Sequence, residues 1–415
     1  MKPYVIIGNG TAAASCIEGI RSLDRETPIT VISEEKHPVY CRPLISYYLE
    51  GKTDLQRINY RPEDFYEVNG CTVFYGVKAI RLDVENKEVS LSDGSVIAYE
   101  KLCVAAGSSP FVPPLEGLDR VENKQTFMTL DDALLLERNI SPDSRVLIVG
   151  AGLIGLKCAE GILERVKSVT VCDLADRVLS SILDDDCAAR MQHHLEKKGV
   201  RFFLADTVAH FDKDKAYMKS GEEVPFDRLI LAVGVRANTS LIKNCGGKVG
   251  RGILVDERMK TSLSDVFAAG DCTESFDISA GQSRVLAILP NANLQGNCAG
   301  VNMAGGNVVF ENAIPMNSIG FFGLHALSAG CDRSGEPGGS MYEESDESHL
   351  KRLFSKDGVL TGFMLIGDTA RAGIYTSLIR NRTLLDTLDF DRLKETPTTA
   401  AFSAAARKQF FGGVI

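Results

Sequence analysis

The sequence predicts an α/β protein that contains one strand–turn–helix unit twice and ends in a small α+β domain. Residues 4–13 read YVIIGNGTAA and residues 146–155 read VLIVGAGLIG, so each is an apolar strand that runs into a glycine turn. Residues 99–107 (YEKLCVAAG) and 226–234 (FDRLILAVG) also match, in the order aromatic, acid, base, leucine and apolar strand. Because chance rarely gives two glycine motifs with matching sequels, we predict a duplicated unit.

Both copies continue with the same elements. The first is predicted to form a helix over residues 10–23 and a strand over 29–33, and the second a helix over 152–165 and a strand over 168–172. A helix between two apolar strands makes a βαβ unit, in which the strands are parallel. The fold class is therefore α/β.

The glycines of each copy predict a binding site for a dinucleotide. The first glycine permits a tight turn, the second lets a pyrophosphate approach the backbone, and the third position lets helix and strand pack closely. The N–H groups and the dipole at the start of the helix then receive the phosphates. The positions are Gly8, Gly10 and Ala13 in the first copy and Gly150, Gly152 and Gly155 in the second. Both units are thus predicted to be Rossmann-like.

An acidic residue ends the second strand of each copy, Glu34 in the first and Asp173 in the second. A carboxylate at this place accepts hydrogen bonds from ribose hydroxyls. At Asp173 it also repels the additional 2′-phosphate of NADP, which favours NAD(H) as the ligand of the second copy. Arg177 follows one turn later and leaves NADP binding open.

The composition excludes several classes of function. The net charge of −9 disfavours nucleic-acid binding, which requires a basic face. The chain begins with an apolar strand instead of a signal peptide, and it has no apolar run of about 18 residues, so we expect a cytoplasmic protein without a membrane span. The 11 cysteines are scattered singly, without a C-x-x-C or a Cys/His cluster, which predicts neither a metal site nor a disulfide framework.

A third motif indicates which dinucleotide each copy binds. Residues 261–272 read TSLSDVFAAGDC and resemble the T-S-x-x-x-I-[YF]-A-x-G-D segment of the pyridine nucleotide–disulfide oxidoreductase superfamily. The resemblance implies that Asp271, which follows Gly270, binds the ribityl chain of FAD. Because this segment comes after the second copy, the first copy is expected to hold FAD and the second NAD(H).

The resemblance also implies a domain organisation. A discontinuous FAD-binding domain takes residues 1–112 and 240–325, and an NAD(H)-binding domain takes residues 113–239. Residues 326–415 form the C-terminal α+β domain, with a hairpin predicted around residues 356–358 because Asp-Gly suits its turn. In relatives such a domain covers the flavin or forms an interface.

Further segments resemble a narrower group, the NADH:rubredoxin and ferredoxin reductases and the flavoprotein part of assimilatory nitrite reductase. Residues 40–46 (YCRPLIS) are similar to their Y-x-R-P-x-L-S motif, which implies that Arg42 lies against the flavin and its phosphates. Residues 290–296 (PNANLQG) resemble the segment whose helix dipole stabilises negative charge on reduced flavin. The remaining residues assigned to cofactor binding are Asn291 and, at the ends of two apolar strands, Ala106, Gly107 and Gly234.

Two residues depart from the pattern of this group. Ferredoxin reductases tend to place a lysine after the R-P-x-L-S segment and a glutamate after the second glycine motif, whereas this chain has Tyr47 and Lys157. We hypothesise that Lys157 brings a positive charge to the flavin–nicotinamide junction and favours reduced flavin. Lys157 and Arg42 are therefore the candidate catalytic residues, and a surface lysine without such a role is the alternative.

Cysteine chemistry is a rival interpretation. The C-x-x-x-x-C of disulfide reductases is absent from the sequence, but Cys41 lies near the place where other superfamily members use a single cysteine. The neighbouring Arg42 could lower the pKa of its thiol and make it reactive. The simpler interpretation of Cys41 is a small side chain beside the flavin.

The sequence therefore predicts an FAD-dependent NAD(P)H:acceptor oxidoreductase. Hydride passes from NADH to FAD, and electrons then leave singly to a separate iron–sulfur carrier (rubredoxin, a ferredoxin or a cluster subunit), or travel in reverse. One alternative is an NADH peroxidase, NADH oxidase or coenzyme A disulfide reductase that uses Cys41, and another is a non-catalytic redox-sensing flavoprotein subunit. The acceptor, the direction and the oligomeric state, a homo-oligomer included, stay open.

Overall fold

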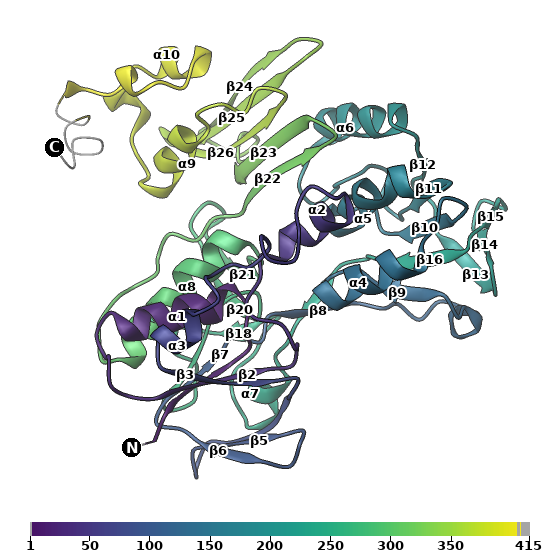
Figure 1. Ribbon diagram of the computed structural model, residues 1–415. Coiled ribbons are helices and arrows are strands. Elements are labelled where there is room, and N and C mark those ends of the chain that lie inside the picture. Colours follow the sequence, from purple (N-terminus) through teal and green to yellow (C-terminus); the bar gives the residue numbers. More distant parts are fainter. Residues whose placement is uncertain (1, 405–406, 408–415) are drawn as a thin grey trace. The chain divides into compact units, whose positions relative to one another are not determined.

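The computed structural model describes residues 2–404 and 407, which form two compact units (Figure 1). The last part of the predicted C-terminal domain, residues 405–406 and 408–415, lies outside the described residues. In the part of the chain that is described, no helix is long and apolar enough to cross a membrane. The first unit comprises the residues up to Ser181 with Gln192–Ser275 and Ser283–Glu311, and the second comprises Ile182–Met191, Phe276–Gln282 and the residues from Asn312 onward.

A parallel sheet of five strands forms the core of the N-terminal part of the first unit. Every residue of its strands β1 (Tyr4–Ile7) and β2 (Ile29–Ser33) is buried, as expected of strands inside a parallel sheet, and the predicted strand over 29–33 is confirmed. The strand order is β19 (Val266–Ala268), β7 (Leu102–Val104), β1, β2 and β3 (Cys71–Tyr75). Because β19 comes from far along the chain, the sheet joins two distant segments.

A second parallel sheet repeats this order. Its strands are β9 (Lys124–Thr126), β16 (Arg228–Leu231), β10 (Arg145–Val149), β11 (Ser168–Cys172) and β12 (Val200–Phe203). A three-stranded antiparallel sheet also occurs in each copy, namely β4 (Ala79–Asp83), β5 (Glu88–Leu91) and β6 (Val96–Ala98) in the first and β13 (Val208–Asp212), β14 (Lys215–Met218) and β15 (Glu223–Pro225) in the second. The duplication is therefore present in the topology.

Individual backbone contacts repeat as well. The N–H group of Gly8 donates to the carbonyl of Ile32 at 2.8 Å, and that of Gly150 donates to the carbonyl of Cys172 at 2.8 Å. After each turn comes a helix, α1 (Thr11–Arg21) or α5 (Leu153–Ile162). The second helix is shorter than predicted because a 3₁₀ turn takes over at residues 163–165.

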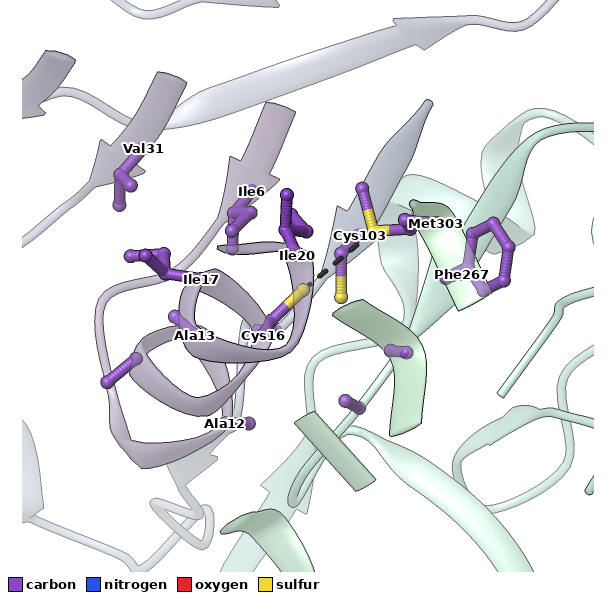
Figure 2. Packing of buried hydrophobic residues seen from close by; sticks show 14 of the residues in the cluster. Ile6, Ala12, Ala13, Cys16, Ile17, Ile20, Val31, Cys103, Phe267 and Met303 are labelled. Carbon is purple, nitrogen blue, oxygen red and sulfur yellow. Dashed lines mark hydrogen bonds between the residues drawn. The ribbon is translucent and has the colours of Figure 1, made fainter. Parts of the chain in front are cut away.

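Helix α8 (Leu289–Met303) lies alongside α1 (Figure 1). Figure 2 shows the apolar cluster around α1, in which Cys16 points toward Met303 and its thiol donates to the methionine sulfur at 3.8 Å. The contact with Cys16 and burial raise the pKa of the Cys103 thiol well above its ordinary value. These buried thiols therefore serve as small apolar side chains.

Several further helices and strands lie outside the sheets described above. Strands β8 (Ser108–Pro110) and β17 (Val235–Ala237) pair antiparallel where the chain passes between the two copies. These elements are α2 (Ile45–Leu49), α3 (Phe65–Val68), β8 (Ser108–Pro110), α4 (Leu130–Asn139), α6 (Asp185–Lys197), β17 (Val235–Ala237), α7 (Ser240–Asn244), β18 (Ile253–Leu254), β20 (Thr273–Asp277) and β21 (Gln282–Arg284).

The second unit is a five-stranded antiparallel sheet with helices. Its strand order is β22 (Met316–Phe321), β23 (Leu324–Gly330), β26 (Val359–Ile366), β25 (Leu350–Lys356) and β24 (Gly339–Ser345), and its helices include α9 (Gly373–Arg380) and α10 (Phe390–Glu395). The predicted hairpin is confirmed, with φ of 49° at Asp357 and 75° at Gly358 in its turn. The predicted fold class is confirmed, whereas the predicted domain boundaries stay predictions.

Candidate functional site

A cavity of about 640 Å³ opens where β1, β2, β7 and β19 end. Ligands of parallel α/β sheets bind at these carboxyl ends. Ala13 and Asn291, which were also predicted to bind the cofactor, are fully buried and do not line the cavity. The predicted residues that do line it are Gly8, Gly10, Glu34, Arg42, Ala106, Gly107, Gly270 and Asp271.

The turn between β1 and α1 requires its glycines. Gly8 has a φ of 112°, and a Cβ atom there would lie 2.1 Å from the carbonyl oxygen of Ala105. A Cβ atom on Gly10 would meet nothing within 4 Å, although it would occupy the wall of the cavity. The backbone at the start of α1 therefore faces open space, where a pyrophosphate can approach it.

Glu34 follows β2 directly and lines the cavity. One of its carboxylate oxygens lies 2.9 Å from the Nζ atom of Lys78, which lines the same cavity. Both side chains are exposed, so this ion pair is weak and can give way to a ligand.

Arg42 begins a 3₁₀ turn (Arg42–Leu44), where Pro43 fixes the first residues. Its guanidinium pairs with the carboxylate of Glu35, donates to the carbonyl of Met128 at 3.1 Å, and lies 5.5 Å from the centre of the Tyr40 ring. These three contacts hold the positive charge at the cavity wall.

Asp271 also lines the cavity and lies in the turn that follows β19. Burial raises the pKa of its carboxyl group above the ordinary range, and the guanidinium of Arg42 opposes the shift. A carboxylate in this wall can accept hydrogen bonds from hydroxyl groups. Leu289 and Ala292, from the first turn of α8, line the cavity nearby.

The second glycine turn has the same geometry as the first. Gly150 has a φ of 120°, and its Cβ atom would lie 2.2 Å from the carbonyl oxygen of Ala232. A Cβ atom on Gly155 would lie 2.0 Å from the carbonyl oxygen of Gly150, so helix and strand touch there. Gly152 is the N-cap of α5, and Gly234 follows β16 with a φ of 107°.

Asp173 lies at the end of β11, as predicted. Its carboxylate accepts the N–H group of Ala151 at 2.6 Å and that of Ala175 at 2.8 Å. The acid is thereby bound to the glycine turn, because Ala151 stands between Gly150 and Gly152. Arg177 pairs with Asp176 at 3.0 Å.

Lys157 is on α5 and is not an ordinary surface lysine, since only 17% of its side chain is exposed. Its Nζ atom lies 2.6 Å from the carboxylate of Glu160 and 5.2 Å from the centre of the Tyr47 ring. The two residues that depart from the ferredoxin reductase pattern are therefore in contact, and the buried Glu160 offsets the lysine charge.

Cys41 is partly buried and does not line the cavity. Burial raises the pKa of its thiol, and the N–H group of Leu44 opposes the shift only in part. The neighbouring guanidinium of Arg42, which pairs with Glu35, does not make this thiol acidic.

A contact between two distant segments was not predicted. His37 and Asp131 both line the cavity, and their Nε2 and Oδ1 atoms are 2.8 Å apart. Close by, the N–H group of Leu130 donates to the hydroxyl of Tyr40 at 3.0 Å. The start of α4 in the second copy thus forms part of the wall of the first site, and no local sequence signal marks this.

Fold and site together define a flavoprotein with two dinucleotide-binding regions. The family model for pyridine nucleotide-disulphide oxidoreductase matches residues 2–296, and the chain belongs to this family. As an oxidoreductase of this family it uses FAD and NAD(H).

Relatives and solved structures agree with this assignment. The chain is 33% identical over 395 residues to the NADH-dependent phenylglyoxylate dehydrogenase subunit epsilon of Aromatoleum evansii, with 93% of each chain covered. It is 31% identical over 387 residues to the assimilatory nitrate reductase electron transfer subunit of Bacillus subtilis, covering 91% of this chain and 49% of that relative, so it spans about half of that protein. The putidaredoxin reductase–putidaredoxin complex matches with a TM-score of 0.87 and 22% identity over 96% of this chain and 99% of that chain, which shows the fold alone.

Proposed function

We propose that the protein passes electrons between NADH and a separate iron–sulfur protein through its FAD. The observation that carries this proposal is the wall of the cavity, in which no described residue is a cysteine. Cys41, the candidate thiol, has a raised pKa and stays outside that wall. This arrangement favours an electron acceptor outside the chain over a cysteine in the cavity wall.

The first site is proposed to hold FAD through its backbone and three side chains. The turn around Gly8 and Gly10 offers N–H groups to the pyrophosphate. Glu34 exchanges its contact with Lys78 for a ribose hydroxyl, and Arg42 balances the phosphate charge. Asp271 accepts a hydrogen bond from the ribityl chain. The flavin, when bound, supplies the conversion between hydride transfer and single-electron transfer.

Further predicted residues support this site through their backbone conformation or their packing. Ala13 is fully buried and allows α1 to pack against the sheet, and Ala106 and Gly107, which follow β7, line the cavity. Gly270 permits the turn before Asp271 with its φ of 83°. Asn291 is fully buried in the first turn of α8, the helix whose start is proposed to face the flavin.

The second site is proposed to hold NADH. Its pyrophosphate lies against the turn formed by Gly150, Gly152 and Gly155. The carboxylate of Asp173 accepts hydrogen bonds from the ribose hydroxyls, including the 2′-hydroxyl that carries a phosphate in NADP. Gly234 lets the chain pass close to the nicotinamide half. Lys157 then places its charge at the junction between nicotinamide and flavin.

The acceptor is proposed to be an iron–sulfur carrier, either rubredoxin or ferredoxin or a cluster subunit of a larger enzyme. The names of two relatives favour the last of these, since one is a subunit of an NADH-dependent dehydrogenase and the other an electron transfer subunit. This chain would then deliver electrons to, or collect them from, a partner subunit.

An anaerobic titration of the purified flavoprotein with NADH tests the proposal. Full bleaching of the flavin at about one NADH per FAD is expected, because the described residues of the cavity wall include no cysteine to take a further pair of electrons. A requirement for about two NADH, with a thiolate charge-transfer band, would instead support the Cys41 alternatives.

The acceptor is tested in a second step. Rubredoxin, ferredoxin and the partner subunit are each added to the NADH-reduced protein, and their absorbance is followed. Rapid reduction of one of them supports the proposal. Rapid oxidation of NADH without reduction of any carrier would contradict it, and negligible flavin reduction would favour the redox-sensing subunit.

A further inference from the structure

A buried glutamine connects the two elements that bring Asp271 and α8 to the cavity. Gln295, on α8, is 2% exposed. Its Oε1 atom accepts the N–H group of Gly270 at 2.8 Å and the hydroxyl of Thr273 at 3.0 Å. Its Nε2 atom donates to the hydroxyl of Ser275 at 3.1 Å. One side chain thus binds the turn after β19 at Gly270 and the start of β20 at Thr273 and Ser275.

The turn held in this way presents Asp271. The hydroxyl of Thr273 also lies 2.8 Å from the carbonyl oxygen of Gly270, a hydrogen bond within the turn. The same hydroxyl contacts Gln295, so the turn is bound to α8 as well. Gly270 sits close to α1, because a Cβ atom there would lie 2.9 Å from the Cβ atom of Ala12. The turn has little room to move as long as the amide is in place.

We propose that Gln295 is a positioning residue for the cofactor. It fixes the turn that carries Asp271 to the same helix whose first residues, Leu289 and Ala292, line the cavity. The carboxylate and the positive end of the α8 dipole therefore reach the flavin in a fixed relation. The inference rests on the proposed FAD site, but not on the identity of the electron acceptor.

The alternative is that Gln295 only stabilises the fold, and the same helix offers a matched control. Asn302 is 5% exposed on α8, and its amide likewise binds backbone away from the cavity. Its Nδ2 atom donates to the carbonyl of Val308 at 2.7 Å, and its Oδ1 atom accepts the N–H group of Val308 at 2.9 Å.

The experiment compares Gln295→Met with Asn302→Leu, both of which replace a buried amide by an apolar side chain of similar size. The readouts are the unfolding midpoint of the holoprotein and the rate of FAD release, followed by flavin fluorescence without NADH or carrier. Each lost hydrogen bond is of the order that changes an equilibrium about tenfold, so both variants should lose similar stability. Only Gln295→Met is expected to release FAD about tenfold faster and to alter the visible flavin spectrum.

A double variant separates positioning from general destabilisation. If Gln295 acts through Asp271, adding Gln295→Met to Asp271→Asn should weaken FAD binding little beyond Asp271→Asn alone. Equal FAD release by Gln295→Met and Asn302→Leu, or additive effects in the double variant, would overturn the inference. If the methionine variant does not fold, Gln295→Asn, whose amide is too short to reach Gly270, gives the same comparison. Failure to reduce a carrier would contradict the proposed function and leave these results intact.

Discussion

A Cβ atom on Gly296 would lie 2.1 Å from the carbonyl oxygen of Ala12. One turn later, a Cβ atom on Gly300 would lie 2.1 Å from the carbonyl oxygen of Cys16. Helices α1 and α8 therefore pack backbone to backbone, and both helices begin at the wall of the same cavity. The positive ends of two helix dipoles therefore lie at the wall of one cavity, where both favour negative charge.

Gly296→Ala is expected to separate these helices. The added methyl group meets backbone atoms that cannot rotate away, so the free energy of unfolding should fall by about 2–3 kcal/mol. The start of α8 should move away from the cavity, and the protein should be purified with less FAD. Thermal unfolding and the ratio of flavin to protein absorbance measure the two effects.

The control for this substitution is Gly373→Ala, at the start of α9. A Cβ atom there meets nothing within 4 Å, so stability should change by no more than about 0.5 kcal/mol and the FAD content should be unchanged. Equal behaviour of the two variants would mean that the α1–α8 contact does not shape the site.

The repeated unit could be predicted because its signals are local. The strands over 29–33 and 168–172 have the predicted bounds, since continuous apolar runs and glycine turns mark their ends. Helix ends were less exact, and α1 begins and ends within two residues of the prediction.

The contacts that complete the site could not be predicted, because they join segments far apart in sequence. His37 and Asp131 are 94 residues apart, and Gln295 and Gly270 are 25 apart. No periodicity or motif links such pairs, which meet only after the chain has folded. A signal did exist for Lys157, whose partner Glu160 follows at the i,i+3 spacing of neighbours on a helix.

Lys157→Met is expected to lower the reduction potential of the flavin. At the position proposed for Lys157, its charge would stabilise a reduced, more negative flavin, and the paired carboxylate of Glu160 would offset much of this charge. A shift of about 30 mV corresponds to about 1.4 kcal/mol for a two-electron couple. Glu160→Gln should raise the potential by a similar amount, because it leaves the lysine charge uncompensated.

The double variant Lys157→Met/Glu160→Gln is the control for this pair. It removes both charges, so its potential should return toward that of the unmodified protein. Potentials are measured by equilibration with a reference dye. Should none of the three variants change the potential, Lys157 has no electrostatic role at the flavin and serves only to pair Glu160.

Asp173→Asn is expected to weaken NADH binding and the preference for NADH over NADPH. An asparagine can accept only one of the two N–H groups, from Ala151 and Ala175, that the carboxylate now accepts. Loss of a charged hydrogen bond should raise the KM for NADH about tenfold. The KM for NADPH should change less, because the repulsion of its 2′-phosphate is removed.

Steady-state kinetics with both nucleotides measures this effect, and Asp176→Asn is the matched control. The side chain of Asp176 is 75% exposed and pairs with the neighbouring Arg177. An unchanged ratio of the two KM values in Asp173→Asn would exclude this carboxylate as the determinant of nucleotide choice.

Asp227→Asn is expected to change stability in a pH-dependent way. The side chain of Arg145 lowers the pKa of Asp227 to about 2, against the opposing effect of burial. Because the pKa in the folded state lies below that of the unfolded chain, the pair stabilises the protein fully above about pH 4 and ceases to do so as the pH falls through 2. Since both side chains are about two-fifths exposed, the stabilisation at pH 7 is about 1 kcal/mol.

Urea unfolding of the unmodified protein and of Asp227→Asn at pH 7, 5 and 3 checks this expectation. The difference in unfolding free energy should be constant from pH 7 to 5 and smaller at pH 3. Arg145→Met should lose about as much stability as Asp227→Asn at pH 7. A difference that stays the same at pH 3 would show that the carboxylate charge does not contribute.

Cys41→Ser is expected to leave electron transfer from NADH to the carrier within about twofold of normal. The thiol has a raised pKa and does not line the cavity, so it is neither a ready thiolate nor in place to meet the flavin. The stoichiometry of the NADH titration should also stay at about one NADH per FAD, because no thiol takes part. Cys71→Ser, another partly buried thiol with a pKa raised by burial, is the control for general effects of the substitution. If Cys41→Ser alone abolished NADH oxidation, the thiol-dependent peroxidase, oxidase or disulfide reductase would become the better interpretation of the site.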